Sequence, residues 1–195
     1  MITSNVTKLL RERLGPELSH DIIKFSQENP TTVPSKFMES GFKRFSTGAA
    51  RKNGDLFEGL FIAILGRSAI SHIILGAEYR CLPYSTVDVA IYTSNNLPIL
   101  ISLKSSLRER WKLSDFEFNR IKSFNPDAVC AIATLKDAST PHRLLESNKL
   151  LGSDYIIDCH IPSHWEKFLT RITKYKDVSC DEDKLLGLLN YAHRS

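Results

Sequence analysis

Two residues suited to phosphodiester chemistry lie in neighbouring apolar runs of the chain. Asp88 lies inside the run Thr86–Tyr92, and Lys104 ends the run Ile99–Lys104. An ionised carboxylate among apolar side chains is costly unless it is paired or bound to a metal ion, so Asp88 needs a partner. An acid beside a lysine can bind a hard divalent cation and orient a water molecule for in-line attack. A simple Asp–Lys ion pair at a strand end is the alternative interpretation.

The elements that carry these two residues are predicted to be adjacent strands. Both runs are rich in β-branched residues, and the segment Thr93–Pro98 between them contains Asn-Asn and Pro, which are typical of a turn. Antiparallel pairing of the two strands would bring Asp88 and Lys104 to the same end of a sheet.

Residues after Lys104 extend this pattern. The lysine ends the tripeptide Ser102-Leu103-Lys104, the triplet Arg108-Glu109-Arg110 begins four residues later, and Glu117 follows the lysine by thirteen residues. Together with Asp88, this arrangement resembles the PD-(D/E)XK nucleases. Within them it resembles the type II restriction endonucleases of the EcoRII-like branch, which read CC:GG-containing sites. The proline of the family's name is absent, because Val87 precedes Asp88.

The resemblance implies a metal site and its ligands. Asp88 and Glu117 would hold Mg²⁺, with the backbone carbonyl of Leu103 as a third ligand, and Lys104 would position or activate the attacking water. In this branch a glutamate thirteen residues after the lysine supplies the missing carboxylate of the tripeptide, and Glu117 occupies that position here. An earlier helix contributes a further acid, for which Glu58 is the candidate and Glu78 the alternative.

The resemblance also implies how the chain meets its substrate, double-stranded DNA. Arginine can donate two hydrogen bonds to guanine and glutamate can accept one from cytosine, so Arg108, Glu109 and Arg110 suit CC/GG half-sites. Cutting both strands of a two-fold-symmetric site needs two active sites, so a homodimer is expected. Residues predicted to contact the DNA backbone or to stack on a base are Lys43, Arg44, Phe45, Arg51, Lys52, Trp111 and Lys112. Phe42 is a further stacking candidate, and a solvated basic loop is the alternative for residues 42–54.

Both additional acids have a structural explanation as well. Ser114 with Glu117 three residues later forms a capping-box pattern, which explains Glu117 without a metal. Glu58 would lie in the first turn of a helix capped by Asn53 or Asp55, where the helix dipole favours a glutamate.

Hydrophobic periodicity and the Gly, Pro and Asn breaks predict the secondary structure. Helices are expected over 5–14, 18–28, 36–45, 56–65, 114–124, 138–151, 163–176 and 181–192, and strands over 72–75, 86–92, 99–104, 128–135 and 155–160. This order predicts an α/β fold with a mixed central sheet flanked by helices on both faces. The resemblance implies that this fold is restriction-endonuclease-like.

The chain has 195 residues, which suits a single nuclease domain. It would comprise a helical amino-terminal layer with a DNA-contact loop (1–54), a catalytic α/β core (55–160) and carboxy-terminal helices (161–195). The net charge of +4 permits nucleic-acid binding without requiring it. Four separated cysteines without a Cys-x-x-Cys pair favour neither zinc nor disulfides, and no leader or membrane-length apolar run is found. We therefore expect a soluble protein of the cytoplasm, in a prokaryotic or phage-type cell interior.

Two other functions remain open from the sequence. A repair or junction-processing nuclease of the same superfamily would keep Asp88, Lys104 and Glu117, and differ in the DNA it selects. A DNA-binding protein without catalysis would keep the fold, although the presence of all three residues argues against lost catalysis.

Overall fold

The computed structural model describes residues 2–70, 72–79, 86–91, 93, 97–106, 110–136, 138–175 and 189–191. The chain divides into two compact units, one of residues 1–71 and 159–176 and the other of residues 72–158 and 177–195. These boundaries differ from those expected at 54 and 160, and helix α4 (Ala50–Arg67) runs through the first of the expected boundaries.

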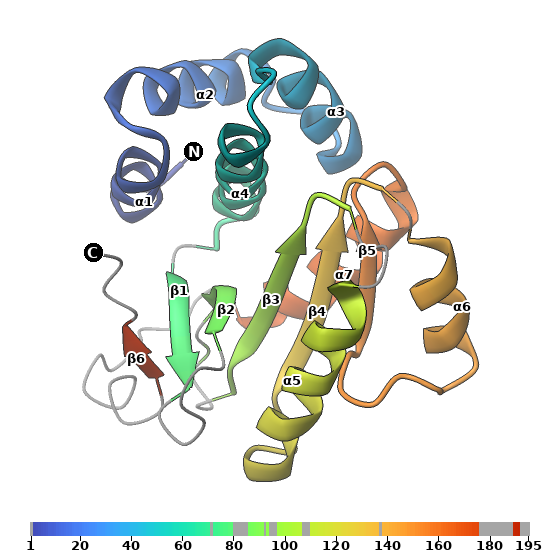
Figure 1. The fold of residues 1–195 in the computed structure, drawn as a ribbon. Coiled ribbons are helices and arrows are strands. Elements are labelled where there is room, and N and C mark those ends of the chain that lie inside the picture. The colour runs from blue at the N-terminus through green and yellow to red at the C-terminus, as the bar shows by residue number, and fades with distance from the viewer. Residues whose placement is uncertain are drawn as a thin grey trace. The chain divides into compact units, whose positions relative to one another are not determined.

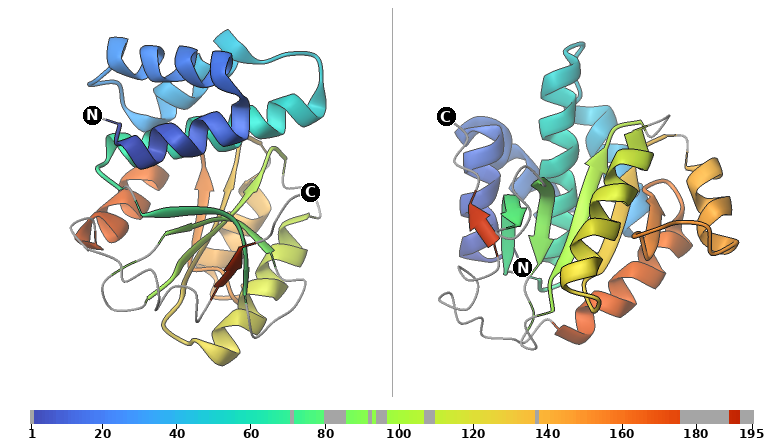
Figure 2. Two further views of the ribbon diagram at one scale, coloured as in Figure 1. Left: turned by 90° about the vertical axis from the view of Figure 1, so that its left-hand side faces the viewer. Right: turned by 60° about the horizontal axis from the view of Figure 1, so that its bottom comes forward.

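The first unit is helical. Helices α1, α2 and α3 pack around α4 (Figures 1 and 2). Every residue of α4 from Leu56 to Gly66 is buried. Proline in the first turn starts three of the helices, since its fixed φ suits that position and its missing N–H is not needed there. The elements are α1 (Ser4–Leu14), α2 (Pro16–Glu28), α3 (Pro34–Phe45), α4, α7 (Pro162–Ile172) and the 3₁₀ turn η1 (Thr173–Tyr175).

The predicted start of α4 is wrong, and so is the first-turn explanation of Glu58. The helix begins at Ala50 without a side-chain cap, so Glu58 lies well past its first turn. Neither predicted capping residue caps the helix. Asn53 instead bonds the backbone of Thr47 in the preceding loop, and Asp55 pairs with Arg13.

The second unit contains a six-stranded sheet in the order β5-β4-β3-β2-β1-β6 (Figure 1). β1, β2 and β3 pair antiparallel, whereas β3, β4 and β5 pair parallel, so the sheet is mixed and the predicted α/β class is confirmed. Every residue of β4 is buried, as its continuous apolar sequence predicts. The strands are β1 (Ile73–Tyr79), β2 (Thr86–Ile91), β3 (Ile99–Lys104), β4 (Val129–Thr134), β5 (Tyr155–Asp158) and β6 (Leu189–Tyr191).

Two helices of this unit contact the sheet. α5 (Arg110–Phe124) packs against β3 and β4, and α6 (Ser139–Glu146) packs against β5. Coverage of both faces of the sheet stays a prediction, because the other helices belong to the first unit. Among the described residues, no helix has the length and apolar content needed to span a bilayer.

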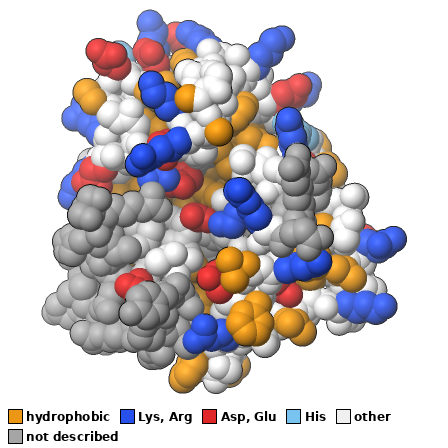
Figure 3. All heavy atoms as spheres, in the orientation of Figure 1, with side chains coloured by type: hydrophobic (Ala, Val, Ile, Leu, Met, Phe, Trp, Pro, Cys, Tyr) orange, Lys and Arg blue, Asp and Glu red, His pale blue; other side chains and the backbone are white. Residues whose placement is uncertain are grey.

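The buried face of α5 carries both apolar and polar side chains. Trp111, Ser114, Asp115, Phe118 and Ile121 are buried, as the spacing of three or four residues requires. Exposed apolar side chains are visible on the surface in the region of α5 (Figure 3), and those of this helix are Leu113, Phe116 and Phe124. Phe116 and Phe124 therefore do not belong to the buried face of this helix.

The carboxy-terminal helix predicted over 181–192 is wrong at residues 189–191, which form β6. This strand pairs with the edge of β1, where Tyr79 lies opposite Leu189 and Ala77 opposite Tyr191. Unpaired backbone groups at a sheet edge favour such pairing over a weak local helical pattern. The rest of the predicted helix lies outside the described residues.

A close contact holds α5 against the segment that precedes β5. The buried Asp115 carboxylate accepts hydrogen bonds from the backbone N–H groups of Leu151, Gly152 and Ser153 at 2.8, 3.0 and 2.8 Å. A Cβ on Gly152 would lie 2.5 Å from the Phe118 carbonyl carbon and closer still to the Asn119 nitrogen. Glycine is therefore needed for the α5 backbone to approach this segment.

We predict that Gly152→Ala destabilises the protein by about 1–3 kcal/mol, because an inserted methyl group forces apart two backbone segments. At about 2–4 °C per kcal/mol, the melting temperature should fall by several degrees. Gly54→Ala is the matched control, since a Cβ there meets nothing within 4 Å and alanine favours a helix. Equal melting temperatures for the two variants would contradict the close approach.

Candidate active site

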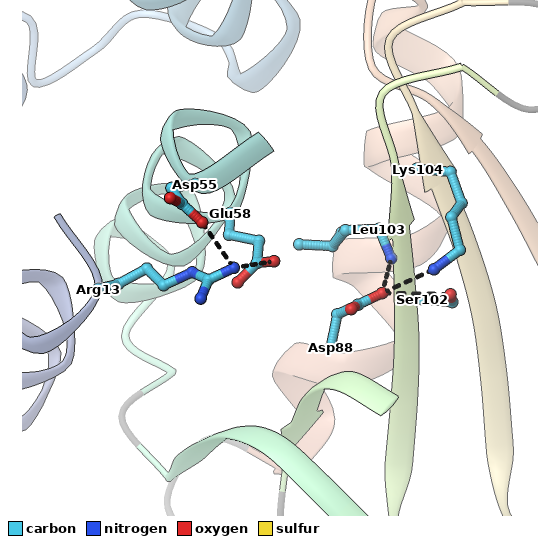
Figure 4. Close-up of polar contacts among 7 residues, drawn as sticks. All are labelled: Arg13, Asp55, Glu58, Asp88, Ser102, Leu103 and Lys104. Atoms are coloured by element: carbon cyan, nitrogen blue, oxygen red, sulfur yellow. Dashed lines mark hydrogen bonds and ion pairs between the residues drawn. The ribbon is translucent and has the colours of Figure 1, made fainter. Parts of the chain in front are cut away.

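The carboxylate of Asp88 takes the place of the backbone ladder at one end of the β2–β3 pair. The pairing of these strands runs from Ile91–Ile99 to Val89–Ile101, and Asp88 is the next residue of β2. Its Oδ2 atom accepts hydrogen bonds from the Leu103 backbone N–H at 2.7 Å, from Lys104 Nζ at 3.1 Å and from Ser102 Oγ at 3.2 Å (Figure 4). The three donors hold one carboxylate oxygen in place.

The second oxygen of Asp88 has a different environment. Oδ1 accepts no hydrogen bond from any residue that the structure describes, although the side chain is only 22% exposed. One oxygen is therefore held by the protein, and the other is left to bind water or a cation. The ion pair with Lys104 is present, as the simpler interpretation requires, and it uses only Oδ2.

The carbonyl of Leu103 faces the same side of β3 as the Leu103 N–H. In an antiparallel pair, the N–H and C=O of one residue point to the same neighbouring strand. Because the N–H is bonded to Asp88, the C=O is directed to the β2 side beyond the last paired residues. This direction fits the predicted backbone ligand.

Glu117 lies on α5 and is half-buried, and the charges of Lys104 and Asp88 affect the pKa of its carboxyl group. Burial raises the pKa of its carboxyl group, the Lys104 ammonium lowers it, the Asp88 carboxylate raises it further and Arg120 lowers it. No hydrogen bond or ion pair joins the Glu117 carboxylate to another described residue. Asp88 and Lys104 thus form a direct contact between two strands, and Glu117 on α5 is near enough for both charges to affect its pKa.

The capping-box explanation of Glu117 is wrong. α5 begins at Arg110, so Ser114 lies inside the helix, where it is 2% exposed. The Ser114 hydroxyl does not bond the first turn of a helix and lies 3.0 Å from Ser102 Oγ on β3. Ser114 and Glu117 have the residue types and spacing of a capping box. The helix nevertheless begins four residues before Ser114, where Trp111 packs in the core.

The donor set fits a magnesium ion. Among the residues described, no three His, Cys, Asp or Glu side chains converge as a metal cluster. Mg²⁺ commonly binds through one or two carboxylates and keeps several waters, so Asp88, Glu117 and one backbone carbonyl suffice. A half-buried glutamate with a raised pKa beside a second carboxylate is also what a cation would stabilise.

Glu58 belongs to the first unit and has a partner that the sequence did not reveal. Arg13 Nη2 lies 2.6 Å from Glu58 Oε1 and 2.9 Å from Asp55 Oδ1 (Figure 4). The pair joins residues 45 positions apart, so no local pattern predicts it. The Arg11-Glu12-Arg13 triplet thus supplies an ion pair between α1 and α4. A role for Glu58 as an additional acid stays a prediction.

Glu78, the alternative acid, lies on β1 opposite Thr86 of β2. Glu78 is therefore in the same sheet as Asp88, and its partner Thr86 precedes Asp88 by two residues on β2. Gly76, with a φ of 58°, lies between the register pairs Leu75–Val89 and Ala77–Val87, and glycine adopts this left-handed backbone without the steric cost of a side chain. The choice between Glu58 and Glu78 stays open.

The predicted DNA-contact residues have different environments. Arg108 and Glu109 lie outside the described residues, and Arg110 is exposed at the start of α5. Trp111 is only 7% exposed and packs in the core, which favours a packing role over base stacking. Phe45 is half-buried against Phe25. The other basic residues predicted to contact DNA are exposed as well, namely Lys43, Arg44, Arg51, Lys52 and Lys112.

Comparisons with protein-family models, with curated proteins and with solved structures find no match for this chain.

We predict that Glu117→Gln makes the metal-free protein more stable at neutral pH and not at acidic pH. A raised pKa means that the folded state binds more protons than the unfolded state between the ordinary and the raised value. Stability of the wild type therefore falls as pH rises through that window, and glutamine removes this loss. Melting curves from pH 4 to 8 would measure it. A variant that is equally destabilised at every pH would show that Glu117 has a packing role instead.

Proposed function

We propose that this protein is a Mg²⁺-dependent nuclease that hydrolyses phosphodiester bonds of double-stranded DNA. The observation that carries the proposal is the grouping of Asp88, Lys104 and Glu117. Asp88 has one oxygen fixed by three donors, Lys104 lies 3.1 Å from that oxygen, and Glu117 is electrostatically coupled to both. A structural ion pair would explain Asp88 and Lys104 alone, but not a second, half-buried carboxyl group without a hydrogen-bond partner among the described residues.

Each residue has a role that follows from its chemistry. Asp88, Glu117 and the Leu103 carbonyl would hold Mg²⁺, which lowers the pKa of bound water and neutralises phosphate charge when bound. The Lys104 ammonium would orient the attacking water and stabilise the charge that develops on the phosphate. The hydrogen bond from Leu103 N–H would keep Asp88 oriented during the reaction.

Sequence-specific restriction of DNA is the form of this activity that we propose. Arg108, Glu109 and Arg110 would read CC/GG half-sites in the major groove, and exposed Lys43, Arg44, Arg51 and Lys52 would contact phosphates. A homodimer would place one site on each strand of a two-fold-symmetric target. A cytoplasmic enzyme of a prokaryotic or phage-type cell is part of the same proposal.

We predict that Asp88→Asn and Lys104→Met each reduce DNA cleavage strongly. Loss of the carboxylate charge should lower activity by more than about 100-fold, since even outer-shell partners of a metal cost 10–100-fold. Loss of the ammonium should cost roughly 10²–10³-fold, as for other groups that stabilise developing charge. Incubation of mixed-sequence plasmid with Mg²⁺, followed by electrophoresis, measures both.

The matched controls are Asp127→Asn and Lys149→Met, which change the same charges at exposed positions. Discrete wild-type bands support restriction, and a smear indicates a nuclease without sequence selection. A gel shift without cutting by the wild type would refute the nuclease and leave a DNA-binding protein. Wild-type activity in either site variant would refute the site.

We predict that Glu109→Ala weakens binding to the cognate duplex by about 1–3 kcal/mol and leaves random-sequence duplex unchanged or slightly tighter. A carboxylate repels phosphates, so Glu109 is unfavourable at a DNA surface unless it accepts from cytosine or orients an arginine. Competition gel shifts at fixed salt, with the target taken from sequenced cleavage ends, compare the two duplexes. Equal weakening of both would show that Glu109 holds its neighbours and does not read bases.

A further inference from the structure

A chain of buried hydroxyl groups joins α5 to Asp88. Ser114 Oγ on α5 lies 3.0 Å from Ser102 Oγ on β3, and Ser102 Oγ lies 3.2 Å from Asp88 Oδ2. Ser114 and Ser102 are 2% and 5% exposed, so their hydroxyl groups need hydrogen-bond partners within the protein. The chain lies within the second unit.

The direction of the two hydrogen bonds follows from the groups involved. An ionised carboxylate only accepts, so Ser102 donates its single proton to Asp88. The Ser102 oxygen must then accept from Ser114, because its own proton is already used. The chain is therefore directed from α5 to the carboxylate, and each hydrogen bond polarises the next.

These contacts join the two halves of the candidate site. Ser114 precedes Glu117 by three residues, so the two side chains are neighbours on the helix surface. Ser102 precedes Lys104 by two residues and shares its face of β3. The bond between the two serines thus connects the helix that carries Glu117 to the strand whose residues hold Asp88.

We propose that Ser114 is a positioning residue of the metal site, an inference that rests on the proposed nuclease function. Through Ser102 it holds Asp88 Oδ2 toward the protein, which leaves Oδ1 for the ion. On the helix side it fixes the distance between Glu117 and Asp88. Glu117 has no hydrogen bond to another described side chain that would set this distance itself. Outer-shell hydrogen bonds of this kind orient metal ligands and tune metal affinity.

The test compares Ser114→Ala with Ser123→Ala. Ser123 lies on the same helix, and among the described residues its exposed hydroxyl bonds only the local Arg120 carbonyl. We expect Ser114→Ala to raise the Mg²⁺ concentration for half-maximal cleavage about tenfold and to leave the KM for DNA unchanged. Excess Mg²⁺ should restore cleavage. Calorimetric titration with Mn²⁺, without DNA, should show the same loss of affinity, and Ser123→Ala should match the wild type in both assays.

Two further variants separate positioning from folding. Ser102→Ala should reproduce the loss, and the double variant should be no worse than either single one, because the groups act as one chain. Ser114→Thr retains a hydroxyl and should recover metal affinity. A lower melting temperature with unchanged metal affinity in both alanine variants would overturn the positioning role alone. A wild-type protein that neither binds Mn²⁺ nor cuts DNA would overturn the proposed function and this inference together.

Discussion

The organising interaction of the second unit is the acceptance of three hydrogen bonds by one oxygen of Asp88. It occurs where the β2–β3 ladder stops, and the Leu103 N–H that would have continued the ladder is used by the carboxylate instead. A carboxylate in a strand that had no partners in the protein would be directed to solvent, where water hydrates it. Here it is held by a backbone amide, a hydroxyl and an ammonium, all from three consecutive residues of β3. The tripeptide Ser102-Leu103-Lys104 thus supplies all three hydrogen-bond donors to Asp88, which explains why these residue types occur together.

α5 sets the position of Glu117, whose carboxylate has no hydrogen bond or ion pair with another residue that the structure describes. α5 is attached to the sheet by the apolar side chains of Trp111, Phe118 and Ile121. Polar contacts then fix it along its length: Ser114 with Ser102, Asp115 with the backbone of residues 151–153, and Lys122 with Asp154. Asp154 in turn accepts the Cys130 N–H of β4. A helix held in this way can present a carboxylate at a defined place while leaving its oxygens available.

Local signals predicted much of this arrangement, and long-range contacts account for the failures. The strands around Asp88 and Lys104 were predictable because apolar β-branched runs and an Asn/Pro turn are local features. The start of α5 was not, because Trp111 enters the core and draws the helix back to Arg110. The Arg13–Glu58 pair spans 45 residues, and β6 depends on the edge of β1, so neither leaves a local pattern. Spacing made Asp88 and Glu117 candidates for the site, whereas the contact between Ser102 and Ser114 became visible only in the structure.

The surroundings of Glu117 are unfavourable for an ionised carboxylate. A half-buried Glu117 beside Asp88 disfavours ionisation, as the raised pKa of Glu117 shows, and the cations Lys104 and Arg120 offset this only in part. A carboxylate whose sole role was structural would gain from exposure or from a direct ion pair, as Glu58 gains from Arg13. In the proposed site, a bound cation would offset this cost where the β2–β3 pairing ends, because a positive charge compensates for the desolvation of the Glu117 carboxylate. Occupancy of the proposed metal site would then depend on pH, since protons compete with the metal for Glu117.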